Sequence, residues 1–247
     1  MRYFIQLSYF GKAYHGWQNQ PNAISVQQVL ETALGTLLRT EIAIVGAGRT
    51  DAGVHAKCMY AHFDHSTIAD HDHLIHRLNA LLPEDIAVQA LRKMNEGAHA
   101  RFDAVERTYE YWISLGKDPF FTDHAHVIHR PLDVDAMNQA AALLLEYDDF
   151  ECFSKSNTDV KTFICSVRHA EWEFKNGLLV FTIKADRFLR NMVRAIVGSL
   201  LEVGLGKIEV EAVRSIIESK DRGQAGASVP AKGLYLTDVR YPETIFE

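Results

Sequence analysis

Segments that alternate apolar and polar residues are interspersed along this chain with segments of helical periodicity. Residues 2–9 alternate as a half-buried strand does, whereas the apolar residues within 26–38 recur at intervals of three and four, as on one face of a helix. Ser25 precedes that face and Gln28 follows three residues later, which is the pattern of a helix capping box. A chain that mixes both periodicities in this way is expected to fold as α+β.

The remaining elements expected from the pattern continue this mixture. Strands are predicted over residues 59–63, 86–91, 108–115, 166–174 and 178–185, and helices over residues 74–82, 134–145 and 188–202. Asn176-Gly177 lies between the last two strands and is a strong hairpin-turn signal. We therefore expect largely antiparallel or mixed sheets with flanking helices.

Each half of the chain supplies several strands and about two helices, which predicts two similar subdomains with a catalytic cleft between them. The best boundary is residues 116–130, which contain Gly, Pro and three His with little periodicity. The expected subdomains are residues 1–115, with a glycine-rich loop, and residues 116–247, with a basic helix.

Composition narrows the class of protein. No apolar run approaches the roughly 18 to 20 residues of a membrane-spanning helix, and the first residues alternate as a strand rather than as a signal peptide, so a cytoplasmic protein without a membrane partner is expected. Three cysteines at unpatterned spacings indicate neither a disulfide framework nor a zinc ribbon. The net charge of -6 argues against generic polyanion binding but allows a local basic cleft.

The densest cluster of unusual residues is Gly46-Ala47-Gly48-Arg49-Thr50-Asp51-Ala52-Gly53. Glycines around a charged pair allow the backbone to approach another molecule closely, although a simple turn with solvated charges has the same composition. A dinucleotide-binding loop would need a third glycine where Asp51 stands, followed by a helix. An aspartic-protease site would need the order Asp-Thr-Gly and a second copy.

Two further clusters combine charged and aromatic residues. If a helix begins near Arg187, then Arg187, Arg190 and Arg194 lie on one side of it, either as a solvated face or as a site for phosphate or carboxylate. Tyr109 and Tyr111 share one strand face beside basic residues, which suits core packing or base stacking. The histidines at residues 71–76 and 124–129 lack the companions of a zinc site, so no metal is expected.

Taken together, these motifs resemble the TruA family of tRNA pseudouridine synthases over nearly the whole chain. The matching motifs are Tyr14-His15-Gly16-Trp17-Gln18, Ser25-Val26-Gln27, Gly48-Arg49-Thr50-Asp51-Ala52-Gly53-Val54-His55-Ala56, Arg101-Phe102-Asp103-Ala104 with Arg107 and Tyr109, Phe188-Leu189-Arg190-Asn191-Met192-Val193-Arg194 with Gly198, and Pro230-Ala231-Lys232-Gly233-Leu234-Tyr235-Leu236.

The resemblance implies an isomerase that converts uridine to pseudouridine in the anticodon stem-loop of tRNA, at positions 38, 39 and 40, as a homodimer without cofactor or metal. By the same likeness, Asp51 is the nucleophile and Arg194 is its catalytic ion-pair partner, while Tyr109 and Arg49 bind the substrate. A stacked uridine must be flipped out to reach such a site.

Two alternative hypotheses about the function compete with this interpretation. A non-catalytic tRNA-binding protein on the same fold would use the basic and aromatic residues without the chemistry of Asp51. An oxidoreductase would use the glycine-rich loop for a nucleotide cofactor, which the missing third glycine disfavours.

Overall fold

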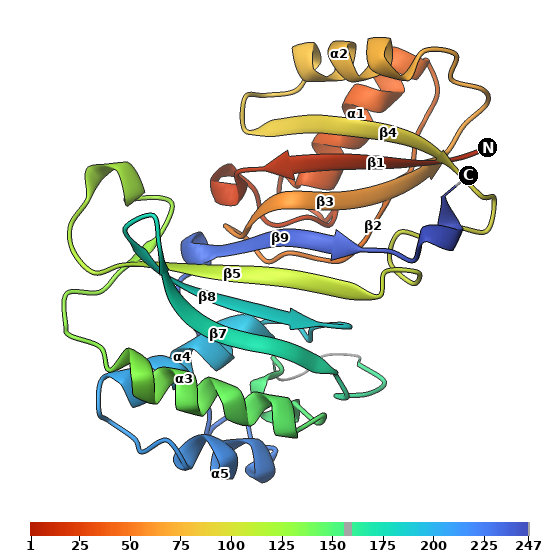
Figure 1. Ribbon diagram of the computed structural model, residues 1–247. Coiled ribbons are helices and arrows are strands. Elements are labelled where there is room, and N and C mark those ends of the chain that lie inside the picture. The colour runs from red at the N-terminus through yellow and green to blue at the C-terminus, as the bar shows by residue number, and fades with distance from the viewer. Residues whose placement is uncertain (156–159, 247) are drawn as a thin grey trace. The chain divides into compact units, whose positions relative to one another are not determined.

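The computed structural model describes residues 1–155 and 160–246 (Figure 1). Packing divides the chain into two compact units, one of Met1–Glu106 with Tyr235–Glu247 and the other of Arg107–Leu234. These bounds differ from a division at residue 116 because the last strand of the chain pairs with the first unit. The division into 1–115 and 116–247 stays a prediction.

The first unit is a mixed sheet with helices. Its elements are β1 Arg2–Tyr9, α1 Val26–Leu38, β2 Val45–Gly46, β3 His55–Asp64, α2 His71–Leu81, β4 Ile86–Met94 and β9 Leu234–Arg240. The strand order is β4-β1-β3-β9, in which β1 pairs antiparallel with β4 and β3, while β9 runs parallel to β3. The short β2 pairs antiparallel with β3. The helices α1 and α2 contact each other, and α2 also packs against β4.

The amino-terminal helix forms as its sequence predicts. The Ser25 hydroxyl accepts a hydrogen bond from the Gln28 backbone N–H at 3.1 Å and so satisfies one of the free donors of the first turn. The predicted apolar face is buried through Val26, Leu30 and Leu34. Arg39 ends the helix in the left-handed conformation.

The second unit also combines a sheet with helices. Its elements are β5 Glu106–Ser114, β6 His126–Val127, α3 Val134–Leu143, β7 Val167–Lys175, β8 Leu178–Ala185, α4 Met192–Gly204 and α5 Ala212–Ser219. The strand order is β5-β8-β7, with antiparallel pairing, and β6 runs parallel to β5. The helix α3 packs on β7 and contacts α4 and α5 (Figure 1). The α+β class is confirmed.

The hairpin between β7 and β8 turns where the sequence predicts. Asn176 and Gly177 have φ angles of 50° and 79°. Two consecutive positive φ angles are the signature of the type I′ turn, whose twist matches that of the flanking strands. Within the described chain, no helix combines the length and apolar character that crossing a bilayer requires.

The start of α4 differs from the expected start near Arg187, because the helix begins at Met192. Asn191 stands before it with φ 68°, a left-handed conformation that an α-helix interior cannot contain. Arg187 and Arg190 therefore precede the helix, and Arg194 is the arginine of the predicted stripe that the helix carries. The predicted arginine stripe on one helical side is wrong.

Candidate active site

The glycine-rich loop connects two antiparallel strands of the first unit. Gly46 on β2 pairs with Ala61 on β3, and the Ala47 N–H donates to the Tyr60 carbonyl at 2.7 Å. The chain then leaves the strand pair and returns to it at His55. The sheet thus holds both ends of the segment that contains Arg49 and Asp51.

Asp51 begins a tight turn within this loop. Its carbonyl oxygen accepts a hydrogen bond from the Val54 N–H at 3.1 Å. Gly53 is the third residue of the turn and has φ +77°, a value that glycine adopts without strain. The Asp51 side chain is half-buried, whereas Arg49 is exposed.

Buried contacts fix the residue that precedes Asp51. Thr50 is buried, and its hydroxyl forms a 2.8 Å hydrogen bond with the hydroxyl of Tyr9 on β1. Its carbonyl oxygen accepts from the Trp17 N–H at 3.2 Å. Gly16 permits this close approach, since a Cβ there would lie 2.3 Å from the Thr50 carbonyl oxygen and its φ is +91°.

The other side of the loop is held by an aromatic cluster. The buried His55 ring stacks on Phe10 at a centroid distance of 4.1 Å and contacts the Tyr235 ring at 4.6 Å. Its Nδ1 accepts a hydrogen bond from the Gly11 N–H at 2.9 Å, which makes the neutral ring with the proton on Nε2 the compatible form. A Cβ at Gly11 would lie 2.0 Å from the Val54 carbonyl oxygen.

Tyr14 completes the support of the turn. Its carbonyl oxygen accepts from the Gly53 N–H at 3.3 Å, and its hydroxyl donates to the Asp85 carboxylate at 2.5 Å. Burial, together with the hydrogen bond to Asp85, raises the pKa of the Tyr14 phenol above its ordinary value, so the hydroxyl stays a donor at neutral pH. The loop is therefore held from several sides before any substrate binds.

Tyr109 lies on β5 of the second unit, opposite Ile183 of β8. It is half-buried, and its ring meets the Phe188 ring edge to face at 5.1 Å. Tyr111, two residues later, is buried, and its hydroxyl donates to the Pro230 carbonyl oxygen at 2.9 Å. Desolvation raises the pKa of Tyr111 above its ordinary value. Tyr111 is thus a core residue, whereas Tyr109 keeps part of its ring accessible.

Arg194 lies in the first turn of α4 and is tied to a segment near the end of the second unit. Its Nε donates to the Val229 carbonyl oxygen at 2.7 Å, and the Val229 N–H donates to the Arg194 carbonyl oxygen at 3.2 Å. Gly198 lets this segment lie against the helix, because a Cβ there would lie 2.0 Å from the Ala227 carbonyl oxygen. Asn191 adds a 2.6 Å hydrogen bond to the Ser228 hydroxyl.

The structure places two of the predicted site residues in each unit. Arg49 and Asp51 share the glycine-rich loop of the first unit, and Tyr109 and Arg194 belong to the second. The meeting of the two pairs around one substrate stays a prediction. The supporting roles of Tyr9, Thr50 and His55 were missed, because their contacts join residues 41 and 44 positions apart in sequence, which periodicity does not register.

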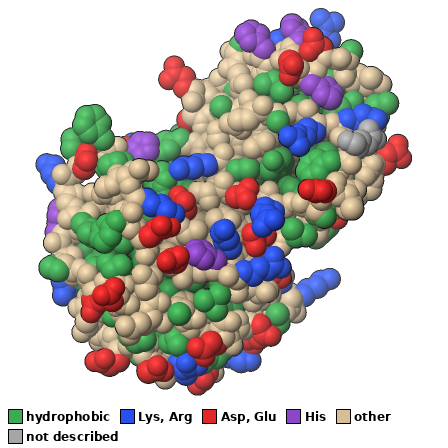
Figure 2. Space-filling view, viewed as in Figure 1, with side chains coloured by type: hydrophobic (Ala, Val, Ile, Leu, Met, Phe, Trp, Pro, Cys, Tyr) green, Lys and Arg blue, Asp and Glu red, His purple; other side chains and the backbone are tan. Residues whose placement is uncertain are grey.

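On the face shown in Figure 2, Lys and Arg side chains lie among Asp and Glu side chains, so this face carries no continuous positively charged patch. This fits the net charge of -6. Within residues 1–155 and 160–246, no three His, Cys, Asp or Glu side chains gather in a way that could hold a metal ion. That the reaction needs no metal stays a prediction.

Comparison with known proteins decides the family. The sequence profile of the tRNA pseudouridine synthase family matches residues 6–103 and 140–242, which cover parts of both units. The chain belongs to this family. The matched segments contain three of the four predicted site residues, and the fourth, Tyr109, lies between the two segments.

Curated relatives match over nearly the full length. The tRNA pseudouridine synthase A of Bacteroides thetaiotaomicron is 54% identical over 248 residues, covering 99% of this chain and 92% of that protein. The protein of the same name from Parabacteroides distasonis is 54% identical, with 99% and 98% covered. A more distant relative from Francisella tularensis is 40% identical, with 99% and 96% covered. These relatives match the chain over both of its compact units.

Proposed function

We propose that the protein isomerises uridine to pseudouridine in the anticodon stem-loop of tRNA, at positions 38, 39 and 40, with Asp51 as the nucleophile. Isomerisation of uridine in tRNA follows from membership of the family and from relatives that carry this name at more than half identity. The observation that supports the choice of residue is the Gly48-Arg49-Thr50-Asp51-Ala52-Gly53 loop, which buried contacts hold in one conformation.

The reaction is an isomerisation, and we propose that it needs neither a redox cofactor nor a metal ion. The bond between ribose C1′ and uracil N1 breaks, the base turns, and C1′ is joined to C5; C5 then loses its proton and N1 gains one, so the product is an isomer of the substrate. One carboxylate suffices for this rearrangement, whereas glycoside hydrolysis commonly uses two carboxyl groups. Asp51 is the acidic residue of the glycine-rich loop, and we propose no cofactor.

Preorganisation of the loop supports this assignment. A catalytic group held in the reactive geometry avoids the entropic cost of being oriented during the reaction. Thr50 and Gly53, on either side of Asp51, are each fixed to a neighbouring segment, through Tyr9 and Trp17 on one side and Tyr14 on the other. The Asp51 backbone therefore has little freedom, and its side chain is not enclosed.

The second unit would supply the groups that complete the site. Arg194 is proposed to pair with Asp51, since an opposite charge within ~4 to 6 Å keeps a carboxylate ionised. Tyr109 is proposed to stack on the target base, which is flipped out of the stem at a cost of a few kcal/mol. The exposed Arg49 is proposed to contact the tRNA near the vacated position. We further propose a cytoplasmic homodimer, as the family resemblance implies.

The test is pseudouridine mapping in unmodified tRNA after incubation with the protein. Wild type should form pseudouridine in the anticodon arm, and Asp51→Asn should abolish it while retaining tRNA binding. Asp70→Asn is a matched control in the same unit, because Asp70 caps α2 and asparagine caps equally well. This control should modify tRNA at the wild-type rate.

A non-catalytic tRNA-binding protein is the alternative. It would bind tRNA without forming pseudouridine, and Asp51→Asn would leave its only activity unchanged. Product formed outside the anticodon arm would retain the reaction class and reject the proposed positions.

A further inference from the structure

One matching motif, Arg101-Phe102-Asp103-Ala104, has no role in the site described above. It follows β4 and precedes β5, in a bend of the first unit. Phe102 is 74% exposed, which is unusual for a phenylalanine. The guanidinium of Arg101, which is also exposed, lies 5.8 Å from the centroid of its ring. A large apolar ring and a cation are therefore presented together.

Hydrogen bonds within residues 99–103 fix the bend that carries Phe102. The N–H groups of Arg101 and Phe102 both point to Nδ1 of His99, at 3.1 and 3.3 Å. The His99 N–H donates to the Asp103 carboxylate at 2.7 Å, and the His99 ring lies 4.2 Å from the Phe102 ring. The motif thus closes on His99, which supports the exposed ring from beneath.

The bend is also anchored to the sheet. The Ala100 N–H donates to Nδ1 of the buried His62 on β3 at 3.1 Å, and the Ala100 carbonyl oxygen accepts from the Tyr241 hydroxyl at 2.6 Å. Arg2 on β1 donates to the Ala98 carbonyl oxygen at 2.8 Å and forms an ion pair with Asp64. An apolar ring on a loop with so many fixed backbone groups is preorganised for a partner rather than loosely displayed.

The chemistry of the pair favours a nucleic-acid base as that partner. Every base has a π-face that can stack on phenylalanine, and an adjacent arginine can contact the phosphate that follows. The family acts on tRNA, so such a ligand accompanies the substrate.

The position of the bend separates it from the turn that carries Asp51. The turn that begins at Asp51 closes on Val54, immediately before His55 of β3, whereas the bend is anchored at His62. Seven residues of strand at ~3.3 Å each put these points about 23 Å apart. A base on Phe102 is therefore a different nucleotide from the one at Asp51.

We propose that Phe102 and Arg101 form a stacking platform for an unpaired tRNA base other than the target uridine, with His99 and His62 as positioning residues. The proposal rests on the proposed function in that tRNA is the ligand. The platform contributes to binding and not to the chemical step.

The experiment measures two quantities with unmodified tRNA, namely the Kd in an Asp51→Asn background and the single-turnover rate at saturating protein with Asp51 intact. Phe102→Ala should weaken binding about 5-fold or more, the effect expected for losing one stacked base. Phe102→Leu should weaken it similarly, whereas Phe102→Trp should bind within about twofold of wild type. The saturated single-turnover rate should be unchanged in all three variants.

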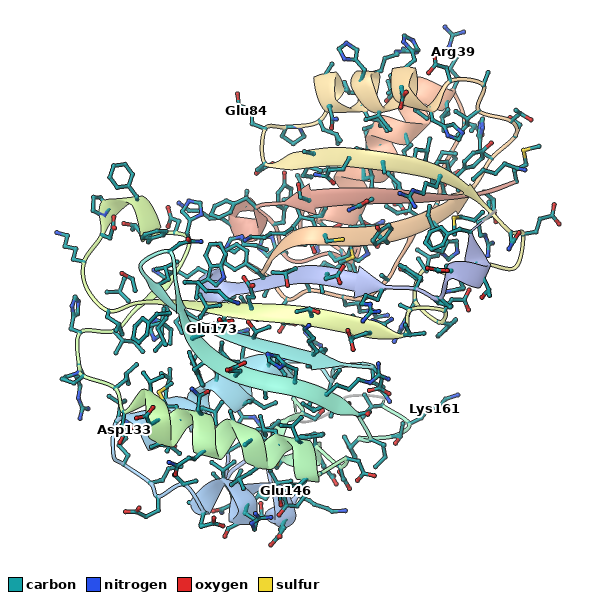
Figure 3. The ribbon with its side chains drawn as sticks, in the orientation of Figure 1. Arg39, Glu84, Asp133, Glu146, Lys161 and Glu173 are labelled. Carbon is teal, nitrogen blue, oxygen red and sulfur yellow. The ribbon has the colours of Figure 1, made fainter. Side chains whose placement is uncertain are left out.

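Phe174 offers a matched control. It is 65% exposed, follows Glu173 on β7 of the second unit (Figure 3), and lies between Glu173 and Lys175, which pair with each other. Phe174→Ala removes a comparable exposed ring and should leave the Kd unchanged. Equal weakening by Phe102→Ala and Phe174→Ala would overturn the proposal.

Two other outcomes would also overturn the proposed stacking platform. Binding of Phe102→Leu at the wild-type Kd would show that the ring does not stack on a base. A change from dimer to monomer in Phe102→Ala, measured by sedimentation, would assign the ring to an interface between copies. Failure of the proposed function is distinguishable, because wild type would then form no pseudouridine in tRNA whatever residue 102 is.

Discussion

Acidification should destabilise the protein through His62, a buried histidine of β3 that accepts a hydrogen bond from the Ala100 N–H. Burial is the main cause that lowers its pKa from 6.5 to about 4, and the positive charges of Arg2 and of protonated His99 add to this effect. Asp64 and Asp103 oppose it less strongly. The folded protein therefore keeps His62 neutral where an unfolded chain would protonate it.

The sign and size follow from linkage. Since the pKa is lower in the folded state, the stabilisation is fully present above about pH 6.5 and is lost as the pH falls toward 4. Integrating between those two pKa values gives a loss of about 2 kcal/mol at pH 5 relative to pH 7.5, with an upper limit of about 3.4 kcal/mol at lower pH. A loss of this size is a large share of a typical free energy of unfolding.

The assay is urea denaturation of wild type and His62→Asn at pH 7.5 and pH 5. The asparagine Oδ1 can still accept the Ala100 N–H but does not titrate, so other acid-sensitive groups cancel in the difference between the two proteins. The advantage of wild type over the variant should shrink by about 2 kcal/mol between pH 7.5 and pH 5. An advantage that is the same at both pH values would refute the reasoning.

Three further predictions concern the supports of the proposed site. Thr50→Val should lower the free energy of unfolding by about 1–3 kcal/mol, because the buried Tyr9 hydroxyl loses its hydrogen bond to Thr50, and it should also lower kcat. A double-mutant cycle with Tyr9→Phe in urea denaturation measures the coupling between the two residues, and purely additive losses of stability would contradict the prediction. Gly16→Ala should destabilise the protein by about 2 kcal/mol or more, because residue 16 has φ +91° and its new Cβ would lie 2.3 Å from the Thr50 carbonyl oxygen. Gly97→Ala, with open space around the added Cβ, should change the free energy of unfolding by less than about 1 kcal/mol. Gly198→Ala should displace Ala227 and with it the Val229 carbonyl oxygen to which Arg194 donates, so the rate of pseudouridine formation should fall more than tenfold. Gly116→Ala, with open space around the added Cβ, is the control, and equal activity of the two variants would show that this packing does not position Arg194.

Most secondary structure could be predicted from local patterns. The capped helix α1, the alternating β1 and the Asn176-Gly177 hairpin all appear where propensity and periodicity indicate, because each depends on residues close in sequence. The first residue of α4 differs from the prediction, and neither α5 nor β9 was among the predicted elements. The apolar periodicity of α4 extends back to residue 188, but the left-handed Asn191, which donates a hydrogen bond to Ser228, makes the helix begin only at Met192.

The sequence by itself determined the family and the glycine-rich loop, because each matching motif is a run of neighbouring residues that can be recognised without the fold. It also indicated the α+β class, since both periodicities are local properties. Only the tertiary structure decided that β9 returns to the first unit, that His62 anchors Ala100 and that Tyr9 holds Thr50. These contacts join residues dozens of positions apart, and their energy depends on burial and approach that exist only after the strands have paired.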